Sequence, residues 1–318
     1  MKDLYGRNIN YLRISVTDLC NLRCKYCTPR HGISKIKHDE ILTFEEIEKI
    51  TKIFVSLGVN KVRITGGEPL VRKGILSLIK KIGEIKEIKD FAITTNGILL
   101  KKYAKDLKQL GVNRVNVSLD TLDPKKYKEI TRGGQIHKVF DGIEEARKVG
   151  LDPIKINTVL VGGFNDNEIE NFVNLTLKDN LEIRFIELMP IGEAKEWDLD
   201  KFITNEVVLD KIKELKEIES QDICSPAKYY KLPHAKGKIG LISPITHKFC
   251  CNCNRVRLTA DGKLKLCLHS NEEIDLKTLL RNGQDIEDII IKSIQKKPKS
   301  HNLENGEYTK RNMMAIGG

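Results

Sequence analysis

Hydrophobic positions in the first 190 residues follow two alternating spacings. Short β-branched and apolar runs, typical of buried strands, are separated by stretches in which apolar residues recur every three or four positions, as on one helix face. The expected strands are residues 12–16, 62–65, 91–94, 114–119, 154–159 and 183–187. Six strand–helix units in succession predict an α/β fold with a parallel sheet, and the count stops short of the eight units of a full barrel.

The first of these helices carries clear start and stop signals. Thr43 and Glu46 have the spacing of a capping box, in which each side chain bonds the backbone of the other residue. Apolar residues then recur at helical spacing up to Leu57, and Gly58 is a typical C-terminal stop. We therefore expect a helix that begins after Thr43 and ends near Gly58.

The pattern changes after residue 190. Residues 191–203 have no clear period, and beyond them we expect a helix over 205–215 and strands over 227–232 and 238–242. Two further extended runs, 255–259 and 263–268, are joined by Asp261-Gly262, a dipeptide typical of a β-hairpin. We expect a barrel-like part, residues 1–190, and a C-terminal α+β region, residues 191–318.

Composition limits the class of protein. The chain has 318 residues, of which 40% are hydrophobic and 31% charged, as in a water-soluble protein with a real core. No apolar run approaches the roughly 18 residues of a membrane span, and the N-terminus lacks the apolar block of a signal peptide. We therefore expect a cytoplasmic protein without a membrane partner, whose thiols stay reduced.

The net charge of +11 raises the question of a nucleic-acid partner. Much of the excess is lysine scattered over the expected helices, which indicates solvated faces instead. Arginine and lysine gathered inside a pocket would suit a small polyanion such as a nucleoside triphosphate. We therefore expect no nucleic-acid partner.

Six of the eight cysteines form two groups of three, and the first group lies between residues 20 and 27. Cys20, Cys24 and Cys27 are too close together for a useful disulfide loop, so they indicate one metal centre. Zinc would take four ligands, with His31 completing the set. A [4Fe–4S] cluster on three thiolates would instead leave one iron open for chemistry. The close spacing favours the cluster, because zinc ligands usually come as two separated pairs.

The residues around this group carry a resemblance. The pattern Cys-x₃-Cys-x₂-Cys, with Tyr26 before the last cysteine and Gly66-Gly67-Glu68-Pro69 on the next strand, resembles the radical S-adenosylmethionine (SAM) superfamily. The resemblance implies a partial (β/α)₆ barrel of the TIM type with an open side. It also implies that the open iron binds SAM, and that an electron from a donor cleaves SAM to a 5′-deoxyadenosyl radical.

The second cysteine group comprises Cys250, Cys253 and Cys267. Zinc is again an alternative, with His269 or Cys251 as the fourth ligand. Arg255 and Arg257 alternate on the adjoining strand, so both side chains lie on one face. Two neighbouring guanidinium groups repel each other unless an anion or another acceptor lies between them, and their geometry matches phosphate.

The stretch Cys-x₂-Cys-Asn-Arg-x-Arg-Leu-x₂-Asp-Gly-x₄-Cys closely resembles the C-terminal motif of the GTP 3′,8-cyclase family. The resemblance implies a lyase with two [4Fe–4S] clusters, the second of which meets the guanine of GTP. The SAM-derived radical would take hydrogen from ribose C3′, and C3′ would attack C8 to give (8S)-3′,8-cyclo-7,8-dihydroguanosine 5′-triphosphate. This is the first step of molybdenum cofactor (molybdopterin) biosynthesis, and the downstream partner would be cyclic pyranopterin monophosphate synthase.

The same resemblance assigns residues to roles. The SAM-contacting positions would be Tyr26, Gly67, Ser118 and Met189. The GTP-contacting positions would be Arg13, Arg63, Thr94, Lys155, Arg255, Val256 and Arg257. No protein acid or base is implied. Cys251 would be a spare thiol, since neighbours on an extended segment point in opposite directions.

The C-terminal tail is expected to reach the open side of the barrel. Met313, Met314 and Ile316 are apolar and suit a docked segment, and Gly317 and Gly318 would then lie near GTP without side chains to obstruct it.

Two other interpretations differ in class. One is a radical SAM peptide maturase with an auxiliary cluster, against which the Arg255–Arg257 pair argues. The other is a zinc protein that binds RNA through two Cys₃His sites, against which the strand–helix pattern argues. A monomer and a homodimer are both compatible with the sequence.

Overall fold

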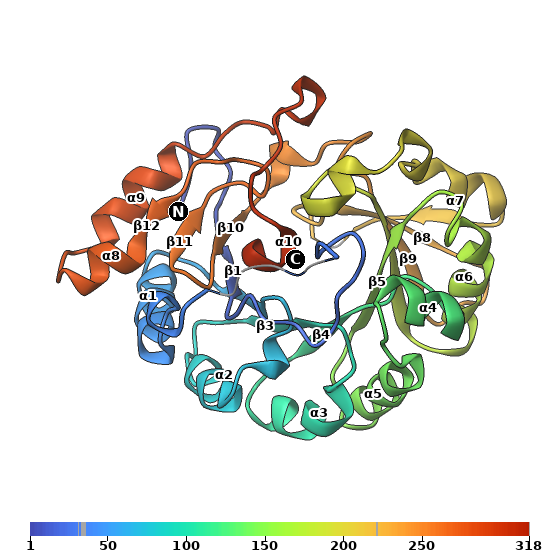
Figure 1. Cartoon of the computed structure of the whole chain (residues 1–318), viewed down its shortest axis with the longest axis horizontal. Coiled ribbons are helices and arrows are strands. Elements are labelled where there is room, and N and C mark those ends of the chain that lie inside the picture. Colours follow the sequence, from blue (N-terminus) through green and yellow to red (C-terminus); the bar gives the residue numbers. More distant parts are fainter. Residues whose placement is uncertain (31, 33–35, 221, 318) are drawn as a thin grey trace.

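The computed structural model describes residues 1–30, 32, 36–220 and 222–317, and its strands form a curved twelve-stranded sheet (Figure 1). The strand order is β12-β11-β10-β1-β2-β3-β4-β5-β6-β9-β8-β7. The C-terminal helix α10 (Met313–Ile316) lies inside the ring of strands (Figure 1).

The six expected strand–helix units are present, so the predicted partial (β/α)₆ barrel is confirmed. All neighbours from β1 to β6 pair in parallel. The strands are β1 (Tyr11–Ser15), β2 (Lys61–Thr65), β3 (Asp90–Thr95), β4 (Arg114–Ser118), β5 (Ile154–Leu160) and β6 (Leu181–Glu187). The helices on their outer side are α1 (Phe44–Ser56), α2 (Ile75–Gly83), α3 (Leu100–Gln109), α4 (Pro124–Ile130), α5 (Ile136–Lys148) and α6 (Ile169–Lys178) (Figure 1).

The start of α1 follows the predicted capping box. The Thr43 hydroxyl accepts from the Glu46 backbone N–H at 3.2 Å, and the Glu46 carboxylate accepts from the Thr43 N–H at 2.8 Å. Ile47, Ile50 and Phe54 are fully buried against the sheet, so the apolar stripe of α1 forms part of the core.

The C-terminal strands extend the sheet at both edges. β9 (Lys238–Ile242) pairs in parallel with β6, and β10 (Arg255–Leu258) pairs in parallel with β1. The outer strands are antiparallel: β8 (Ala227–Lys231) and β7 (Lys216–Ile218) beyond β9, β11 (Lys263–Lys265) and β12 (Ile274–Asp275) beyond β10. β7 and β12 were not expected from the sequence. The division of the chain near residue 190 stays a prediction.

Short helices complete the C-terminal part. The helix expected over 205–215 is confined to α7 (Glu206–Lys211), and α8 (Leu276–Arg281) and α9 (Glu287–Gln295) follow β12. The 3₁₀ turns are His38–Glu40, Pro69–Val71, Asp166–Glu168, Gly192–Glu196, Leu199–Lys201, Cys250–Asn252 and Leu303–Asn305. Within the described part of the chain, no helix has the length and apolar character needed to cross a membrane.

The inner face of the barrel is polar. Alternate residues of the strands, such as Leu12 and Ile64, are fully buried in the apolar layer beneath the helices. Their neighbours face inward, and the register places Arg13 of β1 beside Arg63 of β2 and Arg257 of β10. Barrels of this type usually fill their interior with branched apolar side chains. Charged side chains here leave a hollow centre suited to a polar ligand.

Candidate active site

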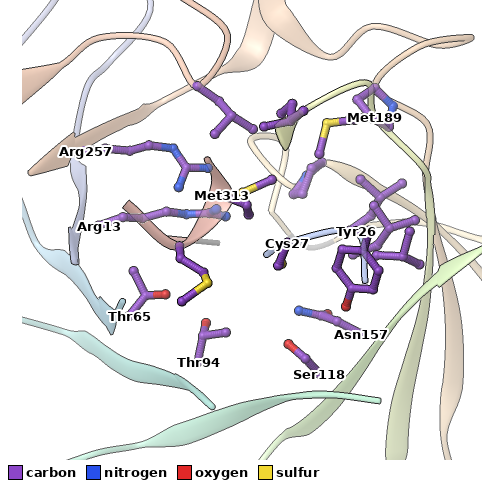
Figure 2. A pocket seen from close by; sticks show the side chains of 18 of the residues that line it. Arg13, Tyr26, Cys27, Thr65, Thr94, Ser118, Asn157, Met189, Arg257 and Met313 are labelled. Atoms are coloured by element: carbon purple, nitrogen blue, oxygen red, sulfur yellow. The ribbon is translucent and has the colours of Figure 1, made fainter. Parts of the chain in front are cut away.

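A cavity of about 340 Å³ lies at the mouth of the barrel and is lined by both cysteine groups. Figure 2 shows part of its lining, with Cys27 of the first group. Its walls come from the inner faces of the strands, the loop after β1, the segment around Cys250 and α10. This volume is within the usual range for small-molecule sites. The cavity therefore brings together motifs more than 200 residues apart in the sequence.

The first cysteine group lies in the loop that follows β1. A tight turn forms where the Cys27 and Thr28 N–H groups both donate to the Cys24 carbonyl at 3.0 Å. Burial raises the pKa of all three thiols, and the neighbouring Cys27 and Cys20 raise the pKa of Cys24 further. The three thiols therefore share one site.

The donor set also bears on the choice between zinc and a cluster. Among the described residues, no three His, Cys, Asp or Glu side chains are close enough to hold a single metal ion. The thiolates of a four-iron cluster bind separate irons, one thiolate to each iron. Each group offers three thiols to the cavity, which would leave one iron open, so the donor set fits that cofactor. His31 lies outside the described residues.

The two glycines after β2 are required by the path of the cysteine loop. A Cβ on Gly66 would lie 2.6 Å from the Thr17 carbonyl oxygen, and one on Gly67 would lie 2.5 Å from that of Leu19. The Gly67 N–H donates to Thr17 at 2.7 Å. Backbone therefore packs directly on backbone at this point, which holds the cysteine loop against β2.

Glu68, the next residue, is fully buried and fastens this turn to the end of β3. Its carboxylate accepts from the Leu70 N–H, the Thr95 hydroxyl and the Asn96 N–H at 2.7–3.1 Å. Burial raises the pKa of Glu68 to about 7, and the three hydrogen bonds oppose that rise. Glu68 supports the wall of the cavity and does not line it.

All four positions expected to contact SAM line the cavity: Tyr26, Gly67, Ser118 and Met189. The Tyr26 hydroxyl donates to Asp120 at 2.6 Å, and Asp120 also accepts from the Val159 N–H at 2.9 Å. Trp197 packs edge-on against the Tyr26 ring, with the ring centroids 6.5 Å apart. The side chain of Tyr26 is therefore held in place from two sides.

The second cysteine group lies beside β10, and Cys250, Cys253 and Cys267 all line the cavity. Cys251 is exposed and is not part of the lining. The expectation of an extended segment here was wrong, because residues 250–252 form a 3₁₀ turn. Within this turn, the side chain of Cys250 still lines the cavity while that of Cys251 is exposed to solvent. His269 also lines the cavity and packs against His301 at a centroid distance of 4.8 Å.

Arginine side chains cover one wall of the cavity, and Figure 2 shows Arg13 and Arg257 extending into it in the same direction. Arg13 and Arg63 stack on the Tyr11 ring, at 5.6 and 5.4 Å from its centroid. In the described part of the chain, neither has a carboxylate within ion-pair distance. Burial and repulsion from Arg257 together lower the pKa of Arg13 to about 9, so Arg13 remains protonated at neutral pH.

The cavity is strongly electropositive. The cations in its lining are Arg13, Arg63, Arg184, Arg255, Arg257 and Lys297, whereas the carboxylates are Asp120 and Glu187. The Asp120 carboxylate accepts from the Tyr26 hydroxyl, and Glu187 accepts from the Thr246 hydroxyl and from three backbone N–H groups. Arg184 is paired with Glu182, but Arg13 and Arg63 have no carboxylate partner among the described residues, so an anionic ligand would match their charge.

Two expected GTP contacts do not line the cavity. Lys155 lies deeper in the barrel, where it pairs with Glu182 at 2.9 Å. Burial and repulsion from Arg184 together lower the pKa of Lys155 to about 7. Val256 is fully buried on the opposite face of β10. Thr94 and the four arginines expected to contact GTP do line it.

The C-terminal tail closes part of the cavity mouth. Met313 and Met314 line it, and Arg257 donates from Nη1 to the Gly317 carbonyl. Arg311 anchors the tail on the β10–β11 hairpin through paired bonds to Asp261 at 2.8–3.0 Å and to Glu273 at 2.6–2.7 Å. The tail is therefore docked where its apolar residues predicted. Gly318 lies outside the described residues.

Sequence reasoning missed several lining residues, among them Asp120, Asn157, Arg184, Lys297 and His301. The position of Asp120, directly after the strand of Ser118, was an available signal, because strand ends meet at the mouth of a barrel. Asn157 and Arg184 could have been found from their alternation with buried residues on β5 and β6. Lys297 and His301 stand in no motif.

Comparisons with known proteins agree with both halves of the chain. The family model described as Radical SAM superfamily matches residues 14–176. A second family model, described as Molybdenum Cofactor Synthesis C, matches residues 181–303. A GTP 3′,8-cyclase of Peptoclostridium acidaminophilum is 57% identical over 317 residues, which cover 99% of this chain and 98% of that protein. One from Alkaliphilus oremlandii is 56% identical over the full length of both chains.

Solved structures share the fold at low sequence identity. Methylornithine synthase (PylB) superposes with a TM-score of 0.56 at 18% identity, over 96% of this chain and 85% of that one. The structure of Streptococcus suis SuiB bound to S-adenosylmethionine superposes with a TM-score of 0.60 at 20% identity, over 89% of this chain and 65% of that one. At these identities the likeness shows the fold alone.

Proposed function

The chain belongs to the GTP 3′,8-cyclase family of radical SAM enzymes, and we propose that it cyclises GTP in the cavity at the mouth of its barrel. This reaction, which joins ribose C3′ to guanine C8, is the first step of molybdenum cofactor biosynthesis. One observation carries the assignment to this cavity: both cysteine groups line the same space as Arg13 and Arg63, for which the described residues offer no carboxylate partner. Family membership decides against the peptide maturase and the zinc-dependent RNA-binding protein.

The cofactors are SAM and two [4Fe–4S] clusters. We assign the first cluster to Cys20, Cys24 and Cys27, and the second to Cys250, Cys253 and Cys267. When bound, the first cluster and SAM supply the 5′-deoxyadenosyl radical that takes the C3′ hydrogen. Tyr26, held by Asp120 and Trp197, would contact SAM together with Gly67, Ser118 and Met189.

The arginine wall would hold the triphosphate. Arg13, Arg63, Arg255 and Arg257 offer guanidinium groups to the cavity, and bidentate bonds to phosphate would relieve their mutual repulsion. Thr94 would add a hydroxyl contact. For Lys155 to reach GTP, its ammonium group would have to leave Glu182, 2.9 Å away.

The tail would help to hold the substrate and to exclude water. Gly317 packs so closely on β1 and β2 that a Cβ there would lie 2.6 Å from Thr65 and 3.1 Å from Ser15. This position leaves the tail backbone beside the arginine wall. A docked tail limits movement of the ribose, and hydrogen transfer depends on geometry within about an ångström.

The remaining partners follow from the reaction. We propose that the protein works in the cytoplasm, where its thiols stay reduced, and that an electron donor supplies the first cluster. Cyclic pyranopterin monophosphate synthase would consume the product.

The proposed function is tested by anaerobic reconstitution, followed by incubation with SAM, a reductant and GTP. We expect roughly eight irons per chain and a nucleotide with the mass of GTP but a different chromatographic retention. The mass is kept because an electron from the reductant and a proton from water replace the hydrogen taken from C3′. A protein that holds both clusters and cleaves SAM yet returns GTP unchanged would refute the assignment.

Replacing Arg13 by methionine should weaken GTP binding without lowering the stability of the fold. Loss of a charged hydrogen-bond donor should weaken GTP binding by roughly 1.5–3 kcal/mol, about 10- to 100-fold. The free energy of unfolding without GTP should not fall, because the variant removes a desolvated cation that repels Arg257.

Equilibrium dialysis with GTP and denaturant unfolding would measure the two effects. The matched control is Arg147→Met, since Arg147 is exposed and paired with Glu144 and Asp179 on the outer surface. A loss of stability in Arg13→Met with unchanged GTP affinity would show that Arg13 has a structural role instead.

A further inference from the structure

A buried arginine from the N-terminal segment holds the backbone around the second cysteine group. Arg7 is only 7% exposed, and its guanidinium donates to the Cys250 carbonyl at 2.9 Å. The same group donates to the carbonyls of residues 297–299 at 2.8–3.3 Å. Its Nε donates to the buried carboxylate of Asp3 at 2.6 Å. One side chain thus connects three segments that are remote in sequence.

A buried lysine completes the arrangement. Lys297 is 3% exposed, and its ammonium group donates to the Arg255 carbonyl at 2.9 Å and to the Leu266 carbonyl. Arg255 lies two residues after Cys253, and Leu266 directly precedes Cys267. Arg7 and Lys297 together therefore hold the backbone at or beside all three cysteines of the second group.

We propose that Arg7 and Lys297 are positioning residues for the second cluster, which keep its three cysteines in place and balance the negative charge of their thiolates. The inference rests on the proposed function, which places a cluster at this group. Three thiolates in a half-buried site need compensating charge or hydrogen bonds. Residues behind metal ligands commonly change metal affinity 10- to 100-fold when they are replaced.

The test compares Arg7→Met and Lys297→Met with wild type after anaerobic reconstitution. We expect iron to fall from about eight to about four per chain in both variants, with loss of cyclised GTP. Reductive cleavage of SAM should persist, because the first cysteine group is untouched. In Arg7→Lys, which keeps the charge but loses the forked geometry, we expect intermediate iron content.

Lys2→Met and Lys296→Met are the matched controls, because both side chains are exposed and belong to the same segments. Both should bind iron as wild type does. Full iron content and an unchanged reduction potential of the second cluster in Arg7→Met and Lys297→Met would overturn the inference. Equal loss from both clusters, with SAM cleavage gone, would also overturn it, because that result indicates a general folding defect. If the wild-type protein itself holds a single cluster, the proposed function fails, and this inference fails with it.

Discussion

Replacing Cys27 by alanine should abolish both SAM cleavage and GTP cyclisation. Cys27 lines the cavity in the tight turn that also holds Cys24, and no exposed thiol of the described chain adjoins that turn. Two thiolates would remain for a cluster that needs at least three. We expect iron to fall from about eight to about four per chain, and 5′-deoxyadenosine to become undetectable.

The control for this variant is Cys251→Ser. Cys251 is exposed and does not line the cavity, so both clusters and full activity should remain. Iron analysis and chromatography of the SAM-derived products would compare the two proteins. Persistent SAM cleavage in Cys27→Ala would contradict the assignment of the first cluster, and loss of a cluster in Cys251→Ser would contradict that of the second.

Removing Gly317 and Gly318 should leave the iron content and the free energy of unfolding unchanged while reducing cyclised product about 100-fold. The rest of the tail stays anchored by Arg311 on Asp261 and Glu273, so the fold should not respond. The deletion removes the backbone that bonds Arg257 and packs on Thr65. We therefore expect SAM cleavage to continue while the C3′ hydrogen of GTP is rarely removed and little GTP is cyclised.

A point variant separates tail length from tail geometry. Gly317 has φ +81°, and a Cβ there would lie 2.6 Å from Thr65, so Gly317→Ala should lose activity with the chain length intact. Lys310→Ala is the matched control, because this side chain is exposed. Turnover of GTP at the wild-type rate by the truncated protein would show that the tail has no part in catalysis.

The strand–helix order and both cysteine groups were predictable because each depends on a local signal. Helical spacing, the Thr43 capping box and the Asp261-Gly262 turn all act within a few residues, and the structure shows each of them. The same holds for Gly66-Gly67, whose strict need for glycine comes from the backbone of the cysteine loop.

Other features depend on contacts that no local pattern encodes. β10 pairs with β1 across more than 200 residues, and this pairing brings Arg257 beside Arg13. Lys155 alternates with Asn157 on β5, yet only Asn157, which lies farther along the strand, lines the cavity. Arg7 and Lys297 are isolated in the sequence, and their place behind the second cysteine group appears only in three dimensions.

The central claim is that one cavity holds SAM beside the ribose of GTP. Incubation of the reconstituted protein with SAM, reductant and GTP carrying deuterium at C3′ tests it most directly. Mass analysis should find one deuterium in the 5′-deoxyadenosine, in amounts matching the cyclised nucleotide. Cyclised product accompanied by 5′-deoxyadenosine without deuterium would contradict the account.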